Sequence, residues 1–195
     1  MRYRKLSLPV LFLFAIFSPL YSETHIAKLD RVVDGDTITL ATNKRVRLIG
    51  IDCPEKHPSD KLIRALEKTN AAYNDMSALA DRSTDMARGM YPSSGGDILL
   101  EFDEERRDQY ERLLAYVYVP YEKMFSGAPA ELIKIENGKK WTMVNGELIR
   151  RGYARAYVIP PNLKYARSLQ SLEWESRRLN RGLWRDPLFR KLYKR

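Results

Sequence analysis

A run of short, closely spaced strands near the start of the chain most constrains the fold. The chain from Ile26 to Ile51 is predicted to form strands: Thr37–Leu40 alternates polar and apolar residues, and Arg45–Leu48 alternates again after a turn at residues 41–44. Such short strands joined by tight turns, with a few helices elsewhere, are typical of a small barrel with helices packed around it.

The rest of the chain supplies further strands and the helices. The pattern predicts a helical region that begins at a Ser59 or Asp60 cap and ends before Pro92, strands over 98–102 and 113–119, a hairpin at Asn137-Gly138, a short helix from an Asn145 cap to Gly152, and a last helix over 163–181. No repeat or low-complexity linker divides these elements. We therefore expect one domain over residues 23–187, followed by a short basic tail over 188–195.

Composition narrows the chemistry. The chain has 195 residues, one cysteine, two histidines and a formal charge of +9. A single cysteine excludes an internal disulfide and a cysteine-rich zinc site, and two histidines argue against a multi-histidine metal site. The basic charge indicates an anionic partner, such as nucleic acid or a membrane surface, without choosing between them.

The N-terminus has the layout of a secretory signal peptide. Basic residues come first, an apolar stretch runs from Leu6 to Leu20, and Ser22 offers a small residue at the cleavage site. A membrane anchor is the rival interpretation, but the stretch is shorter than the roughly 20 residues that span a bilayer. We expect residues 1–22 to be removed and the product to be exported, periplasmic or extracellular, and not bound to a membrane.

Four carboxylates fall in one short window: Asp34, Asp36, Asp52 and Glu55. Hard divalent cations such as calcium prefer ligands of this kind. A two-residue turn at Thr42-Asn43 would place Asp36 diagonally from an arginine of the next strand, at a spacing of about 7–8 Å that suits a shared phosphate.

Arg47 is that arginine, and its place in the strand poses a difficulty. Strict alternation puts Arg47 and Asp52 on opposite faces, so a bend near Gly50 is required. Structural interpretations compete with the functional one: Asp34-Gly35 is a common turn dipeptide, and Arg47 or Arg112 alone is an ordinary surface cation.

The motifs in their order along the chain resemble the staphylococcal nuclease family. The matching segments are Val33–Thr37, Arg47–Glu55 with the following Lys56–Pro58, Asp108–Tyr116, Val144–Ala154, Glu173 and Gly182–Trp184. The resemblance implies an α+β fold, a five-stranded OB-type β-barrel with about three helices. It also implies calcium-dependent cleavage of phosphodiester bonds in DNA and RNA that leaves 3′-phosphate and 5′-hydroxyl ends.

The resemblance also assigns roles to residues. It makes Asp36, Asp52 and the backbone carbonyl of Cys53 the calcium ligands, with Asp34 supporting them from close by. It assigns Arg47 and Arg112 to binding the reacting phosphate. It assigns Glu55 to the attacking water, which Glu55 would deprotonate or orient. It places Tyr110 and Tyr157 against the bound nucleotide.

Two other classes of function stay open. One is a non-catalytic, nuclease-like module that only binds nucleic acid, against which the full set of acidic and arginine residues argues. The other is an exported basic protein that binds anionic polymers or membranes, which leaves the acidic cluster unexplained. DNA and RNA are the expected partners of the enzyme, which is expected to be a monomer with no stable protein partner.

Overall fold

The computed structural model describes residues 23–194, so the predicted signal peptide lies outside the described residues. Its centre is a closed barrel of five strands: β1 (Thr24–Asp34), β2 (Thr37–Leu40), β3 (Arg45–Leu48), β5 (Asp97–Glu101) and β6 (Leu113–Pro120). Neighbouring strands pair antiparallel, and parallel pairing of β3 with β6 closes the ring. The predicted OB-type barrel is confirmed.

The turn between β2 and β3 differs from the predicted two-residue turn. Thr37 pairs with Arg47 and Thr39 pairs with Arg45, which leaves three residues, 41–43, between Leu40 and Lys44. Asn43 adopts a left-handed conformation with φ of 61°, and asparagine tolerates this region better than most residues. The extra residue shifts the register by one position and brings Asp36 beside Leu48 instead of Ile49, with a backbone hydrogen bond of 2.9 Å.

Further strands extend the barrel. β7 (Ile133–Glu136) and β8 (Lys139–Met143) form the hairpin predicted at Asn137-Gly138 and continue the sheet beyond β6. β4 (Gly50–Asp52) follows β3 directly and pairs with β9 (Arg155–Tyr157), more than a hundred residues later in the chain. This second, two-stranded sheet carries one of the predicted metal ligands, Asp52.

The described residues hold five α-helices, where about three were predicted. They are α1 (Asp60–Thr69), α2 (Tyr73–Met90), α3 (Val144–Arg150), α4 (Ala166–Arg178) and α5 (Pro187–Leu192), with 3-10 turns at Lys123–Phe125, Ala130–Leu132 and Gly182–Arg185. The predicted helical region is two helices because Asn70 ends α1 in a left-handed conformation. Ser59 caps α1 as predicted, accepting a hydrogen bond from the Leu62 backbone. No helix of the described part is both long and apolar enough to span a membrane.

Asn145 does not cap α3 but lies inside it. Its side chain accepts a hydrogen bond from the Val117 amide at 2.9 Å and donates to the Ile49 carbonyl at 2.8 Å. It thereby links α3 to β6, which holds Val117, and to Ile49, the residue that follows β3. Both backbone groups are buried and would otherwise lack these partners, so the amide is a structural link.

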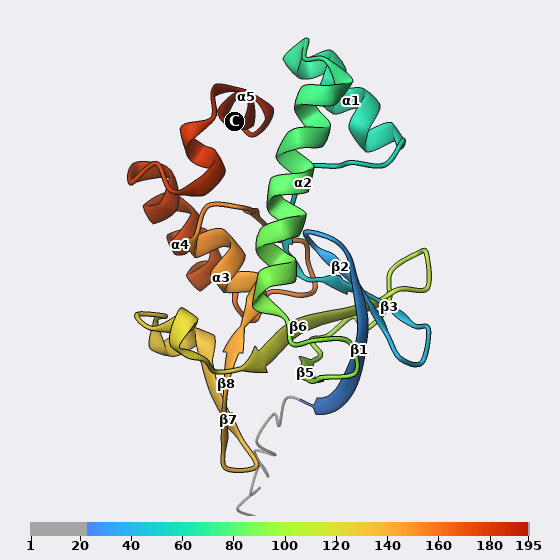
Figure 1. Ribbon diagram of the computed structural model, residues 1–195, viewed down its shortest axis with the longest axis vertical. Helices are drawn as coiled ribbons and strands as arrows, with labels where there is room; N and C mark the ends of the chain where they lie inside the picture. The colour runs from blue at the N-terminus through green and yellow to red at the C-terminus, as the bar shows by residue number, and fades with distance from the viewer. Residues whose placement is uncertain (1–22, 195) are drawn as a thin grey trace, which may run out of the picture.

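The expected basic tail after Pro187 is wrong, because those residues fold. Phe189, Leu192 and Tyr193 are buried and pack with Trp184 and with residues of α1 and α2 in a second apolar cluster. Figure 1 shows α5 beside the upper ends of α1 and α2, at the far end of α2 from the barrel. The C-terminal segment therefore helps to fix the helices that flank the site.

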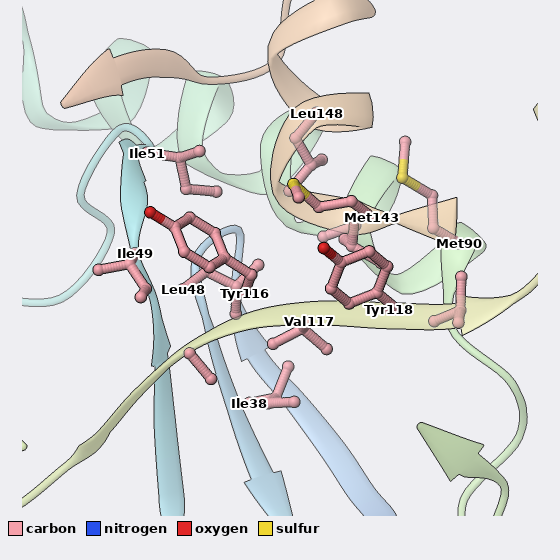
Figure 2. Packing of buried hydrophobic residues seen from close by; sticks show 14 of the residues in the cluster. Ile38, Leu48, Ile49, Ile51, Met90, Tyr116, Val117, Tyr118, Met143 and Leu148 are labelled. Carbon is pink, nitrogen blue, oxygen red and sulfur yellow. The ribbon is translucent and has the colours of Figure 1, made fainter. Parts of the chain in front are cut away.

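The main core fills the barrel and the space between the barrel and its helices. Figure 2 shows Tyr116 and Tyr118 of β6 between the barrel strands and α3, with Met143 and Leu148 beside them. Val46, Ile38 and Leu48, which alternate with the polar residues of β2 and β3, are almost completely buried. This burial fixes the face on which Arg47 lies.

Candidate active site

Arg47 and Asp36 form the centre of the site. The guanidinium of Arg47 lies 2.6 Å from Asp36 Oδ1 and donates to the Ile51 carbonyl at 3.2 Å, and its side chain is 16% exposed. Although burial opposes a charged Asp36, Arg47 and Lys61 hold the pKa of this carboxyl below its ordinary value. Asp36 is therefore an anion held in direct contact with a buried cation.

Gly50 supplies the predicted bend. Its φ is +79°, and a Cβ at this position would lie 2.4 Å from the side chain of Leu169. Glycine is thus required both by the backbone conformation and by the close approach of α4. The bend turns β4 so that Asp52 Oδ1 comes within 3.7 Å of Arg47 Nη2, which resolves the difficulty of opposite faces.

Gly35 lets the Asp34–Asp36 turn approach the segment after β4. A Cβ on Gly35 would lie 2.7 Å from Cys53 Sγ and 2.5 Å from Ser83 Oγ. Because the two segments touch, the Cys53 amide donates to Asp36 Oδ2 at 2.9 Å. The backbone at Cys53 is therefore fixed relative to Asp36.

Cys53 points its thiol inward, away from any role as a ligand. The side chain is buried, and burial, followed by the charge of Asp36, raises the pKa of the thiol well above its usual value. A protonated thiol is a poor ligand for any cation. The backbone carbonyl of Cys53 instead accepts a hydrogen bond from Lys61 Nζ at 3.1 Å. Its oxygen therefore faces a cationic group, as an oxygen that binds calcium would.

Asp34 stands behind Asp36. Its Oδ1 accepts a hydrogen bond from the Asp36 amide at 3.0 Å. Burial, followed by repulsion from Asp36, raises the pKa of Asp34 to about 7. An added cation nearby would favour the charged form of this buried carboxyl.

Glu55 lies beside this cluster and is partly exposed. Its carboxylate Oε2 lies 3.8 Å from Lys61 Nζ, and 22% of the side chain is exposed. A carboxylate with open access beside a charged cluster is well placed to hold a water molecule.

The second predicted arginine lies at the adjoining edge of the barrel. Arg112 precedes Leu113, which pairs with Val46 next to Arg47. Asp108 orients Arg112 by accepting from its Nε at 2.7 Å, and the guanidinium lies over the ring of Tyr110. Parallel pairing of β3 with β6 thus brings both predicted phosphate-binding arginines to neighbouring strands.

The two predicted nucleotide-contacting tyrosines are exposed. Tyr110 is 70% exposed in the turn before β6, and Tyr157 is 44% exposed on β9, where it pairs with Gly50. Exposed aromatic rings beside arginines are suited to stacking against bases.

Two cations at the site were not predicted from the sequence. Arg155 Nε donates to Asp52 Oδ2 at 3.0 Å, and Lys61 Nζ lies 2.7 Å from Asp52 Oδ1. Arg155 stands two positions before Tyr157, on the same face of a strand, which is a signal that could have found it. Lys61 lies in the first turn of a helix, and no local signal in the sequence distinguishes it.

The residues suit a hard cation although they are not a dense ligand cluster. Within residues 23–194 no three His, Cys, Asp or Glu side chains converge as a metal-binding group. Instead, Asp52 Oδ1 and the Cys53 carbonyl converge on one cation, the Lys61 ammonium. Two carboxylates and a carbonyl are oxygen donors, the type that calcium prefers, with water completing its shell of six to eight ligands.

Comparisons with known proteins find similar sequences over most of the chain. The family model described as "Staphylococcal nuclease homologue" matches residues 45–186. Thermonuclease of Staphylococcus intermedius is 28% identical over 165 residues, covering 83% of this chain and 76% of the relative. Two Bacillus subtilis proteins are also similar: the SPbeta prophage-derived endonuclease YokF, at 34% identity, and endonuclease YncB, at 32%. Each of these matches covers 80% of this chain, but only 43% of YokF and 60% of YncB.

Proposed function

Because the chain belongs to the staphylococcal nuclease family, we propose that it is a calcium-dependent endonuclease that hydrolyses phosphodiester bonds of DNA and RNA. One observation carries the proposal: the bend at Gly50 brings Arg47 between the buried carboxylates Asp36 and Asp52. A structural ion pair would need only one carboxylate. The relatives named thermonuclease and endonuclease support the same class of reaction.

The arginines bind the phosphate in this mechanism. Hydrolysis increases the negative charge on the non-bridging oxygens of the phosphoryl group. Arg47, held by Asp36 and by backbone carbonyls, presents its guanidinium in one orientation, and Asp108 does the same for Arg112. Pre-oriented guanidiniums donate two parallel hydrogen bonds and need little reorganisation as this charge grows.

Asp36, Asp52 and the Cys53 carbonyl would hold the calcium ion. When bound, it supplies positive charge to a non-bridging phosphate oxygen and helps to position water. Asp34 would support these ligands from behind, since a bound cation would favour its charged form, and the burial of Asp36 and Asp52 keeps solvent from screening them.

Glu55 receives or directs the proton of the attacking water. Water oxygen forms a bond to phosphorus, the bond from phosphorus to the 5′ oxygen breaks, and that oxygen takes a proton to become a hydroxyl. The products are a 3′-phosphate and a 5′-hydroxyl, as the family resemblance implies. Positioned proton transfer of this kind contributes about 10²–10⁴-fold to rate.

Export completes the proposal. The predicted N-terminal signal peptide supports a periplasmic or extracellular enzyme. We also propose that the enzyme acts as a monomer.

The test is digestion of DNA and of RNA by the purified protein with calcium, with a calcium chelator, and with zinc after chelation. We expect cleavage of both substrates with calcium alone, and phosphatase-sensitive 3′ ends on the products. Binding without cleavage would favour the non-catalytic module. Cleavage that survives thorough chelation would refute the proposed cofactor.

A further inference from the structure

Lys61 lies where the proposed metal ligands converge. Its Nζ is 2.7 Å from Asp52 Oδ1, 3.1 Å from the Cys53 carbonyl oxygen and 3.8 Å from Glu55 Oε2. Two of these groups are proposed metal ligands, and the third is assigned to the attacking water. The lysine therefore contacts the reactive half of the site, not its rim.

The ammonium and a divalent cation cannot both keep these contacts. Calcium binds oxygen at about 2.3–2.6 Å, so an ion held by Asp52 and the Cys53 carbonyl would lie within a few ångströms of the nitrogen. Two cations so close repel each other strongly in a poorly screened site. Binding of the metal therefore requires Lys61 to move away.

Lys61 is also the site cation best able to move. Its side chain is 40% exposed, against 16% for Arg47 and 28% for Arg155. Its backbone is fixed in the first turn of α1, where Ser59 caps the helix, so only the flexible four-carbon stem must swing. Arg47, in contrast, is anchored by Asp36 and by two backbone carbonyls.

From these contacts we infer that Lys61 is a tethered cation that competes with calcium for Asp52 and the Cys53 carbonyl. It sets the calcium concentration at which the nuclease becomes active. In the metal-free protein it neutralises Asp52 and keeps the site assembled. The apparent affinity for calcium is the intrinsic affinity multiplied by the fraction of time that the ammonium is away. The inference rests on the proposed calcium site.

The test measures calcium binding directly, by calorimetric titration of the metal-free protein without nucleic acid. Lys61→Met keeps the stem and removes the charge, whereas Lys61→Arg keeps a cation. Lys56→Met is the matched control, because Lys56 lies in the loop just before α1, is similarly exposed and pairs with Asp81, outside the site. It reports the effect of losing one positive charge nearby.

We expect Lys61→Met to bind calcium on the order of tenfold more tightly than wild type, which corresponds to an ammonium that occupies the site about nine-tenths of the time. Lys56→Met should change the affinity much less, and Lys61→Arg should not tighten it. Equal affinity in wild type and Lys61→Met, or equal tightening in both methionine variants, would overturn the competition while leaving the calcium site intact. If neither wild type nor Lys61→Met binds calcium, the proposed metal site fails, and the competition with it.

Discussion

Replacing Arg47 with methionine is expected to destabilise the fold as well as abolish cleavage. The guanidinium is the counter-charge of Asp36, whose side chain is 9% exposed, and it also approaches Asp52 at 3.7 Å. Methionine keeps much of the apolar stem but leaves these carboxylates without their shared cation. A buried charge that loses its partner is more costly than the pair was favourable.

The expected size follows from this burial. Removing one partner of a buried ion pair typically costs about 3–5 kcal/mol. For a domain of this size each kcal/mol lowers Tm by roughly 2–4 °C, so we expect a decrease of about 6–20 °C. Calcium should restore part of the loss, because a bound divalent cation supplies charge to the same carboxylates.

Arg112→Met is the matched control. Both arginines are assigned to the phosphate, but Arg112 pairs with Asp108 four residues away in a partly exposed turn, and both side chains are more exposed than those of Arg47 and Asp36, so we expect a smaller loss of about 1 kcal/mol. The assay is thermal and urea unfolding of wild type and both variants, each with chelator and with calcium, alongside nuclease rates. Both variants should lose cleavage, and only Arg47→Met should lose several kcal/mol. Equal stability of the two variants would refute the assignment of Arg47 as the buried counter-charge.

Three other outcomes are expected. Glu55→Gln should lower turnover by about 10²-fold or more, because the carboxylate acts on the attacking water. The unfolding transition should not shift, because this partly exposed carboxylate supports no buried contact. Near-normal turnover would show that Glu55 takes no part in the reaction. Cys53→Ala and Cys53→Thr should keep calcium affinity and turnover within a few-fold, since any residue supplies the backbone carbonyl. Each should lower the free energy of unfolding by about 1 kcal/mol through altered packing. Loss of calcium dependence in a folded variant would reopen a role for the thiol. Nucleic-acid affinity of the Glu55→Gln protein should fall steeply with added salt, because cationic residues on a polyanion release counterions, and a flat response in a filter-binding titration would count against a surface that follows phosphates.

The sequence by itself determined which elements form and which chemistry the site can hold. Alternation over residues 37–48 specified β2 and β3, and Asn137-Gly138 specified the β7–β8 hairpin, because these signals depend on residues close together in the chain. The grouping of Asp34, Asp36, Asp52 and Glu55 in one window likewise indicated a hard-cation site. The bend near Gly50 could also be predicted locally, because strict alternation alone would put Arg47 and Asp52 on opposite faces of the strand.

Only the tertiary structure decided how these parts meet. The turn between β2 and β3 has one more residue than predicted, so Asp36 lies beside Leu48 instead of Ile49. The carboxylate of Asp36, held by the Cys53 amide, nevertheless contacts Arg47 directly. Asn145 links α3 to the barrel, and α5 packs on α1 and α2 where a tail was expected, because buried polar and apolar groups found partners far away in sequence.

The two cations that were not predicted also reach the site through contacts that only the tertiary structure makes. Arg155 reaches Asp52 through the pairing of β9 with β4, and Lys61 reaches it because the loop after β4 folds back at the start of α1. Local sequence patterns report propensity and periodicity, whereas the partner of a buried charge is chosen by long-range packing. The sequence therefore indicated the acidic ligands, and the three-dimensional fold determined which cations balance them.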